Sequence, residues 1–284
     1  MSICICPVCC FPLMKRENGY FCEKGHHFDR ARSGYTNLLV GKAGGQHGDN
    51  LEMIRARRDF LNGGYYAPLK EALCRVVDNY FPQGGTLLDA GCGECYYTQG
   101  AMEIVSSRGG CGVGIDISKE ALRVGGVRPA VKSGTLTLFA AGVYHMPIGD
   151  TSVDMVLNFF APLVREEYVR VLKPQGVLVM AIPAARHLWE MKEVLYDTPK
   201  ENQVEDFALP GFTLLEEREV TSSFILEGQE KIHALFSMTP YYFRTPKEGR
   251  ARLAALDTLA VTGRFHLLVY RKEGETLDRT SFLG

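Results

Sequence analysis

The segment Thr86-Leu-Leu-Asp-Ala-Gly-Cys-Gly-Glu-Cys-Tyr-Tyr-Thr98 indicates the architecture of the chain more clearly than any other. Its apolar start predicts a short buried strand that ends at Asp89, and the polar and aromatic residues at its end are suited to open a helix. Between them lies a turn that contains Gly91 and Gly93. Because glycine has no Cβ, the backbone can turn sharply there and come close to a ligand. The stretch therefore indicates a strand, a ligand-binding turn and a helix in direct succession.

A second buried strand supplies an acidic residue. Cys111-Gly-Val-Gly-Ile-Asp-Ile-Ser118 has the composition of a buried strand, and Asp116 lies at its C-terminal end. A carboxylate in this position can accept hydrogen bonds from the two hydroxyls of a ribose. Together the two strands predict a βαβ unit that binds a nucleotide cofactor.

Two nucleotide cofactors compete for this arrangement. A pyrophosphate dinucleotide such as NAD prefers three glycines and no acid in the loop, because carboxylates repel its phosphates. Here Cys95 stands at the third glycine position, Glu94 lies inside the loop and Asp89 opens it. S-adenosylmethionine carries a sulfonium and an amino acid group, and it tolerates both carboxylates. We therefore predict S-adenosylmethionine as the cofactor.

Strand and helix patterns alternate from residue 86 onward. Strands are expected at residues 86–90, 111–117, 135–140, 153–160, 176–182, 211–226 and 264–271. Helices are expected at residues 95–106, 118–128, 164–172, 186–196 and 228–238. Two amphipathic helices precede them, one at Leu51–Leu61 with Asn50 as N-cap and one from Tyr65 to about Tyr80. The alternation favours an α/β fold with a mostly parallel seven-stranded sheet covered on both faces, whose last two strands pair as an antiparallel hairpin.

The first 40 residues hold a cluster of metal-binding residue types. Cys6-Pro-Val-Cys9 is followed by Cys22 and His26, and this Cys-x2-Cys-x12-Cys-x3-His spacing favours a tetrahedral zinc site of the Cys3His type. Cys10 and His27 adjoin these residues and are alternative ligands; reduced cysteines without metal are the competing interpretation. Four protein ligands leave no open position, so we expect a structural zinc that stabilises a segment too short to build its own core.

The overall composition is that of an ordinary globular chain, with 284 residues, 46% of them hydrophobic, and a net charge of −1. This balance argues against nonspecific nucleic-acid binding by the whole surface, and no DNA partner is expected. The basic residues gather in residues 1–60, which hold nine Lys and Arg against six Asp and Glu. No apolar run approaches the ~20 residues of a membrane span and no signal-peptide pattern is present. We expect a cytoplasmic protein, and the odd number of cysteines, nine, with five of them in the first 22 residues, suggests metal binding rather than disulfides.

Two sets of motifs resemble known methyltransferases. The Asp89 loop, Asp116 and Val171-Leu-Lys-Pro-Gln-Gly-Val177 look like the class I S-adenosylmethionine-dependent methyltransferases, over about residues 65–284. The N-terminal segment is more specific, with Cys-Pro-x-Cys, Cys-x3-His-x-Phe-Asp and Gly-Tyr-x-Asn-Leu-Leu followed by Met53-x-x-Ala-Arg-Arg58. With these motifs the chain closely resembles the RlmA/RrmA/TlrB family of bacterial 23S rRNA guanine-N1 methyltransferases along essentially its whole length.

The resemblance implies three parts, namely a zinc-binding module at residues 1–40, a linker and basic helix at 41–64 and a methyltransferase domain at 65–284. It implies a structural zinc held by Cys6, Cys9, Cys22 and His26. Together with the loop chemistry, it implies cofactor contacts from Tyr66, Asp89, Gly91, Gly93, Glu94, Asp116 and His187. It also suggests a homodimer, and Asn158-Phe-Phe-Ala-Pro162 favours the TlrB-type branch. In one departure from the family pattern, Cys95 replaces a glycine.

The reaction so implied is methyl transfer to N1 of a guanine in a hairpin loop of 23S rRNA. Guanine N1 must lose a proton, and the base must leave its stack to reach the methyl group. Asn158 ends the fourth strand and is the candidate catalytic residue, because an amide can both donate to and accept from a purine edge. Phe159 and Phe160 either stack on the base or fill the core. His187 has the chemistry of a base, although the resemblance places it beside the cofactor.

The zinc module and the cluster Arg55, Arg57 and Arg58 form the expected RNA-binding surface. One rival is a methyltransferase of the same fold that acts on a small molecule, but such an enzyme needs neither a zinc module nor a basic helix. The other rival is a non-catalytic zinc-ribbon adaptor that only binds S-adenosylmethionine. The complete set of loop and strand-end residues, including Asp89 and Asp116, argues against a chain that has lost its activity.

Overall fold

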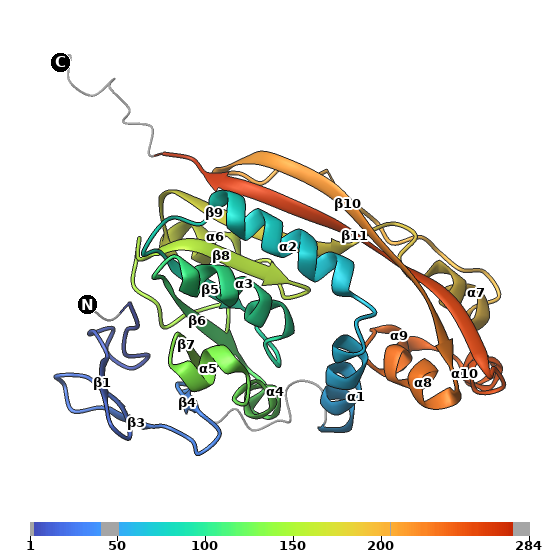
Figure 1. The fold of residues 1–284 in the computed structure, drawn as a ribbon, viewed down its shortest axis with the longest axis horizontal. Coiled ribbons are helices and arrows are strands. Elements are labelled where there is room, and N and C mark those ends of the chain that lie inside the picture. The colour runs from blue at the N-terminus through green and yellow to red at the C-terminus, as the bar shows by residue number, and fades with distance from the viewer. Residues whose placement is uncertain (1–2, 41–50, 205, 275–284) are drawn as a thin grey trace, which may run out of the picture.

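The computed structural model describes residues 3–40, 51–204 and 206–274. Its centre is an eight-stranded sheet with the order β10-β11-β9-β8-β5-β6-β7-β4 (Figure 1). The strands from β9 to β4 are parallel to one another, whereas β11 is antiparallel to both β9 and β10. The bounds are β4 (Tyr35–Asn37), β5 (Thr86–Ala90), β6 (Cys111–Asp116), β7 (Leu136–Ala140), β8 (Val153–Phe159), β9 (Leu172–Pro183), β10 (Phe212–Glu227) and β11 (Thr258–Lys272).

The helices largely follow the expected pattern. Their bounds are α1 (Leu51–Asn62), α2 (Ala67–Tyr80), α3 (Tyr96–Ser107), α4 (Lys119–Gly125), α5 (Pro129–Ser133), α6 (Arg165–Val171), α7 (Trp189–Leu195), α8 (Gln229–Ser237), α9 (Tyr241–Arg244) and α10 (Lys247–Ala254). The single helix predicted over 118–128 is wrong at its end, because α4 stops at Gly125 and α5 begins at Pro129. Proline disfavours a helical residue before it, and Arg128 is extended with φ −61° and ψ 143°. Asn50 and the loop at 41–50 lie outside the described residues.

Both faces of the sheet are buried, and alternate residues of β5 point to opposite faces. Leu87 belongs to the core cluster that contains the apolar residues of α2 and α3. Leu88 belongs to a second cluster, which contains Tyr168 of α6 and Leu13 of the N-terminal segment. A strand that is apolar on both sides is what a doubly covered parallel sheet requires, and the N-terminal segment completes one of its two covers.

The N-terminal segment also extends the sheet. Its own antiparallel sheet consists of β1 (Met14–Arg16), β2 (Gly19–Phe21) and β3 (His27–Asp29). Within the expected zinc-binding module at residues 1–40, β4 pairs outside the module and runs parallel to β7, with Tyr35 opposite Leu138. The main sheet therefore has eight strands, one more than the seven that were expected. Without β4, the strand β7 would be an edge with unpaired backbone groups, and this addition covers it.

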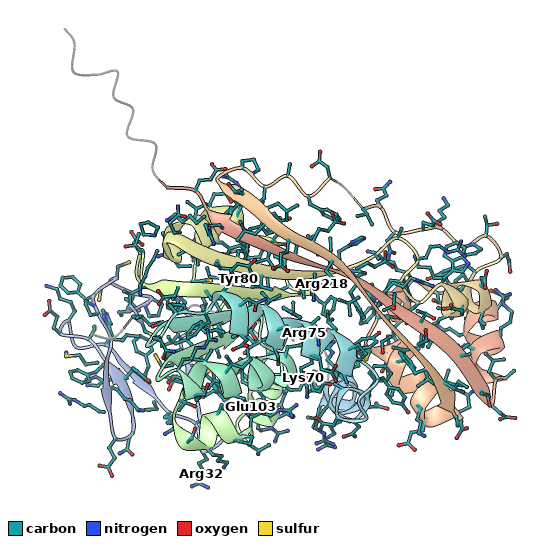
Figure 2. The ribbon with its side chains drawn as sticks, turned by 45° about the horizontal axis from the view of Figure 1, so that its top comes forward. Arg32, Lys70, Arg75, Tyr80, Glu103 and Arg218 are labelled. Carbon is teal, nitrogen blue, oxygen red and sulfur yellow. The ribbon has the colours of Figure 1, made fainter. Side chains whose placement is uncertain are left out.

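The last two strands form the expected antiparallel pair, from Phe212 opposite Lys272 to Glu227 opposite Thr258. They project beyond the rest of the sheet, and α8, α9 and α10 lie between them in sequence at the far end (Figure 1). Helix α2 crosses this pair, and the Tyr80 hydroxyl, labelled in Figure 2, donates to Glu216 Oε1 at 2.6 Å. Among the described residues, no helix combines the length and the apolar character needed to cross a bilayer.

Candidate functional site

The glycine turn after β5 lies at the C-terminal edge of the parallel strands. Gly91 has φ +92° and Gly93 has φ +52°, both in the left-handed region that glycine adopts without strain. A Cβ at Gly91 would come within 2.6 Å of the Ala161 Cβ, so no larger residue fits there. The amides of Gly91 and Cys92 donate to the Ile115 carbonyl at 2.8 and 2.9 Å, which ties the turn to β6. A Cβ at Gly93 would meet nothing within 4 Å, so the turn faces open space.

Asp116 is held at the end of β6 by two backbone amides. Its Oδ2 accepts from the Gly93 amide at 2.8 Å and its Oδ1 accepts from the Ser118 amide at 2.7 Å. The carboxylate is therefore fixed beside the glycine turn. A carboxylate at this strand end is suited to accept hydrogen bonds from the two hydroxyls of a ribose.

Asp89 is buried at the end of β5 with one oxygen unsatisfied. The residue is 2% exposed, and its Oδ2 accepts from the Thr98 hydroxyl at 2.5 Å. Its Oδ1 is buried without a hydrogen-bond partner among the described residues. Burial raises the pKa of Asp89 to about 7. A buried acceptor of this kind fits a cationic donor, such as the ammonium group of an amino acid.

Glu94 is also buried, and the charges of arginines from two distant segments act on it. Burial raises the pKa of its carboxyl group, and the charges of Arg57 and, to a lesser degree, Arg128 oppose this rise. Arg128 Nε donates to the Glu94 carbonyl at 3.0 Å and its Nη1 donates to Asn62 Oδ1 at 3.2 Å. Arg57 was expected on an RNA-binding surface. Its charge acts on Glu94 instead, so it lies close to the turn at residues 89–95, which we call the cofactor loop. Arg55 is exposed, and Arg58 pairs with Asp59 at 2.7 Å.

An aromatic group forms one wall beside the loop. Tyr66 and His187 are both buried, and both rings contact Phe265, with centroids 4.9 and 4.7 Å apart. His187 Nδ1 lies 2.9 Å from the Arg264 carbonyl oxygen. Burial lowers the pKa of His187 to about 4, so the imidazole is neutral near pH 7. A neutral ring with one nitrogen bound to the backbone is a poor general base, and it suits a positioning role beside a ligand.

Tyr97 is a candidate site residue that the sequence analysis missed. It lies in the first turn of α3, directly after the glycine loop, and its ring lies 4.8 Å from Phe159. Its hydroxyl oxygen is buried without a hydrogen-bond partner among the described residues. Burial raises the pKa of this hydroxyl, with smaller contributions from Tyr66, Tyr96 and Glu94. The aromatic pair that follows Cys95 was the available signal, but the sequence did not show which hydroxyl is buried.

Three consecutive residues at the end of β8 differ in burial and in their contacts. Asn158 is buried, and its Nδ2 donates to the Tyr168 hydroxyl at 2.6 Å and to the Pro162 carbonyl at 3.1 Å. Phe159 is buried against Tyr97, whereas Phe160 is 45% exposed and has φ +61°. A left-handed phenylalanine is strained, and such strain is common where a loop is shaped for function.

The predicted metal ligands come together in the N-terminal module. One ligand atom from each of Cys6, Cys9, Cys22 and His26 lies within 4.8 Å of the others. Cys22 Sγ is 3.3 Å from His26 Nδ1 and 3.6 Å from Cys9 Sγ. Tetrahedral zinc with Zn–S of about 2.3 Å and Zn–N of about 2.0 Å separates its ligand atoms by roughly 3.5–3.8 Å. The module therefore presents a site of the right size, and the alternative ligand Cys10 is exposed and outside the group.

Comparison with known proteins gives this arrangement a family. Residues 4–42 match the family model described as RlmA, N-terminal, a zinc ribbon, and residues 82–237 match that of a methyltransferase domain. A protein of Micromonospora griseorubida named as a candidate 23S rRNA (guanine-N1-)-methyltransferase is 32% identical, over 94% of this chain and 96% of its own. The chain belongs to the family of 23S rRNA (guanine-N1-)-methyltransferases.

A second relative in this family is the 23S rRNA (guanine(748)-N1)-methyltransferase of Streptomyces fradiae, which is 30% identical over 90% of this chain and 94% of its own. A solved complex of the Haloferax volcanii Trm112 methyltransferase activator with a candidate methyltransferase is also similar. It has a TM-score of 0.47, 19% identity, and coverage of 76% of this chain and 97% of the solved one.

As a member of the family, the chain is an S-adenosylmethionine-dependent methyltransferase with a zinc ribbon at its N-terminus. The site fits both groups. The unsatisfied Asp89 Oδ1 and the open space above Gly93 fit the amino acid end of the cofactor, and the fixed carboxylate of Asp116 fits its ribose. The sulfur and nitrogen ligands of the ribbon are the donors that zinc prefers.

Proposed function

We propose that this protein methylates N1 of a guanine in a hairpin loop of 23S rRNA, as an enzyme of the TlrB-like branch. The observation that carries the proposal is similarity over nearly the full length to relatives named for this reaction, combined with a cofactor site that retains Asp89 and Asp116. The Asn158–Pro162 motif and the relative named for guanine 748 favour the TlrB-like branch.

In this proposal the residues of the loop hold the methyl donor, which supplies an electrophilic methyl group when bound. Asp89 Oδ1 accepts from the amino group of the donor, Asp116 binds the ribose hydroxyls, and the glycines allow the backbone to approach. Glu94, Tyr66 and His187 complete the surrounding wall. These residues supply alignment rather than strong acid or base chemistry, which suits a reaction whose electrophile is already activated.

The acceptor guanine needs a surface on which it can stack after it leaves the RNA loop. Phe160 meets this need because it is exposed. The ring centroids of Phe265 and Tyr97 lie 5.6 and 6.2 Å from the centroid of the Phe160 ring. Asn158 acts in this scheme as a positioning residue, because its bonds to Tyr168 and Pro162 fix the turn that carries Phe160. The buried hydroxyl of Tyr97 is available to the base or to the donor.

The zinc ribbon and the exposed Arg55 are proposed to bind the RNA outside the reacting nucleotide. Cys6, Cys9, Cys22 and His26 are the proposed ligands of a zinc that stabilises the ribbon and takes no part in the chemistry. In this proposal Arg57 does not belong to the RNA-binding surface, and its charge instead favours the ionised form of the Glu94 carboxyl group. The expectations of a homodimer, of a cytoplasmic location, and of neither DNA nor membrane as a partner belong to the same proposal.

Methyl transfer to alternative acceptors tests this proposal against the small-molecule and adaptor readings. The protein is incubated with S-adenosylmethionine labelled with tritium in its methyl group, together with unmodified 23S rRNA and a mixture of small acceptors. We expect the label in the rRNA. Label in small acceptors alone would support a small-molecule enzyme, and cofactor binding without transfer to any acceptor would support an adaptor.

A further inference from the structure

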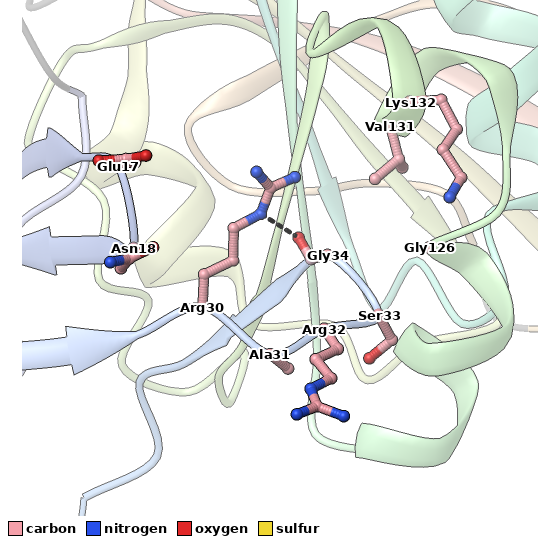
Figure 3. A pocket seen from close by; sticks show the side chains of 10 residues that line it. All are labelled: Glu17, Asn18, Arg30, Ala31, Arg32, Ser33, Gly34, Gly126, Val131 and Lys132. Atoms are coloured by element: carbon pink, nitrogen blue, oxygen red, sulfur yellow. Dashed lines mark hydrogen bonds between the residues drawn. The ribbon is translucent and has the colours of Figure 1, made fainter.

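A polar cavity lies where the zinc ribbon meets the methyltransferase domain. Its volume is about 280 Å³. One side is formed by the β1–β2 turn and by the segment that joins β3 to β4, and the other side is formed by α5 and the turn before it (Figure 3). The charged and polar side chains around it belong to Glu17, Asn18, Arg30, Arg32, Ser33 and Lys132.

The charge around this cavity is mostly positive and uncompensated. Arg30, Arg32 and Lys132 are cationic, and Glu17 is the one acidic residue among those that line it. Among the described residues, none of these three cations has a carboxylate within ion-pair distance. Arginines elsewhere on the surface do have such partners, as in Arg108 with Asp78 at 2.6 Å and Arg170 with Asp150 at 2.7 Å.

Arg30 is oriented for anion binding. Its Nε donates to the Gly34 carbonyl at 3.3 Å, which holds the side chain along the wall of the cavity (Figure 3). No hydrogen bond to a described residue occupies its two terminal nitrogens, Nη1 and Nη2. A guanidinium group fixed in this way presents a planar pair of donors, which matches two oxygens of a phosphate. Val131 and Lys132 lie across from it (Figure 3).

Two adjacent glycines, Gly125 and Gly126, lie between the cavity and the cofactor loop. A Cβ on Gly126, which lines the cavity, would come within 1.8 Å of the Ser33 carbonyl of the ribbon. A Cβ on the preceding Gly125 would come within 3.0 Å of Cys95 Sγ and 3.3 Å of Glu94 in the cofactor loop. One tight turn thus contacts both the zinc ribbon and the cofactor loop.

We propose that this cavity binds a backbone phosphate of the substrate RNA, close in sequence to the nucleotide that is methylated. The inference rests on the proposed function, because it takes the RNA to be the occupant. Arg30 binds the phosphate oxygens in a bidentate manner, and Lys132 and Arg32 add positive charge around the cavity. The zinc ribbon contributes Arg30 and Arg32, and the methyltransferase domain contributes Lys132, so the RNA is held by both parts at once.

RNA binding measured over a range of salt concentrations tests the cavity. The variant Arg30→Ala/Lys132→Ala is compared with the wild-type chain for binding of unmodified 23S rRNA. Each phosphate contact contributes about 0.7–0.9 to the slope of log affinity against log salt. We expect the variant to lose about tenfold in RNA affinity at moderate salt and roughly 1 unit of this slope, with unchanged affinity for S-adenosylmethionine.

Matched controls separate the cavity from general charge. Arg75→Ala/Arg218→Ala removes the same charge from α2 and β10, and Figure 2 shows both residues far from Arg32. This control should keep the wild-type slope, and Arg30→Lys/Lys132→Arg should recover most of it. The charge reversal Lys132→Glu, at an exposed position, should weaken RNA binding further without unfolding the protein.

Two results would overturn the inference, and they differ from each other. If the wild-type chain binds 23S rRNA and the cavity variant keeps both its affinity and its slope, the cavity does not bind phosphate although the proposed function stands. If the wild-type chain itself neither binds nor methylates 23S rRNA, the proposed function fails and the cavity assignment fails with it.

Discussion

At the scale of single residues, the site is distinguished by buried polar atoms that the protein leaves without partners. Asp89 Oδ1 and the Tyr97 hydroxyl are both buried and unpaired among the described residues. An unpaired buried polar atom costs roughly 1–3 kcal/mol, and a fold retains such a cost where a ligand repays it. Asp89 is the more informative of the two, because its charge state changes near neutral pH.

Asp89 makes cofactor binding depend on pH. Its pKa is raised to about 7 in the free protein, whereas an ammonium group bound at Oδ1 would favour the ionised form. The free protein then holds a proton that the complex releases, so affinity for S-adenosylmethionine rises with pH up to about 7. The unfolded chain loses the Asp89 proton near the ordinary pKa of 3.8, whereas the folded free protein retains it up to about pH 7. The free energy of unfolding of the free protein therefore falls as pH rises from 3.8 towards about 7.

Calorimetry at several pH values checks this prediction. Asp89→Asn should lose the rise in affinity between pH ~6 and ~7 and should bind roughly tenfold or more weakly at pH ~7.5, as expected for a lost hydrogen bond to a charged group. Asp197→Asn, at an exposed carboxylate paired with Arg252, should keep the wild-type profile. A profile of Asp89→Asn identical to wild type would contradict the role given to Asp89.

The arrangement of the residues in the cofactor loop could be predicted from sequence because it depends on local geometry. Gly91, Gly93 and Asp116 lie next to strand ends, and the structure brings them together. Arg57 and Tyr97 could not be assigned, because their neighbours come from distant parts of the chain. The amide donors of Asn158 are engaged by Tyr168 and Pro162, a contact that no sequence pattern indicated.

At the scale of elements, the zinc ribbon is joined to the catalytic fold by β4. This strand pairs with β7, and the ribbon residue Leu13 packs in the same core cluster as Leu88. The sequence indicated the four residues that cluster in the ribbon, because their spacing is a local signal. It did not predict the partner of β4, since pairing at the edge of a sheet depends on which strand is left uncovered.

Zinc removal should therefore affect the ribbon more than the cofactor site. Cys9→Ala deletes one of the four clustered ligands, and we expect loss of zinc together with unfolding of residues around β1 to β3. The parallel strands and the cofactor loop have their own core, so affinity for S-adenosylmethionine should change by less than about threefold.

Elemental analysis and cofactor titration check this prediction together. Cys10→Ala is the matched control, because Cys10 is adjacent to Cys9 but exposed and outside the ligand group. It should keep one zinc per chain. Full zinc content in Cys9→Ala would contradict the ligand assignment, and loss of zinc in Cys10→Ala would indicate that the neighbouring cysteine serves instead.

At the scale of the whole molecule, the proposed function combines three features. In that proposal the cofactor loop holds the methyl donor, the exposed Phe160 offers a stacking surface, and the cavity beside the ribbon offers positive charge. The α/β class and the order of the elements were predictable from alternation along the chain. The interface between the ribbon and the methyltransferase domain was not predictable, because it depends on the contact between Gly126 and Ser33, two residues that only folding brings together.

Analysis of the modified nucleotide shows whether the protein methylates guanine N1 of 23S rRNA. Unmodified 23S rRNA is treated with the protein and S-adenosylmethionine, digested to nucleosides and fragments, and examined by mass spectrometry. We expect a single new 1-methylguanosine located in a hairpin loop. Absence of any methylated guanosine, or methylation only at another atom of the base, would contradict this expectation.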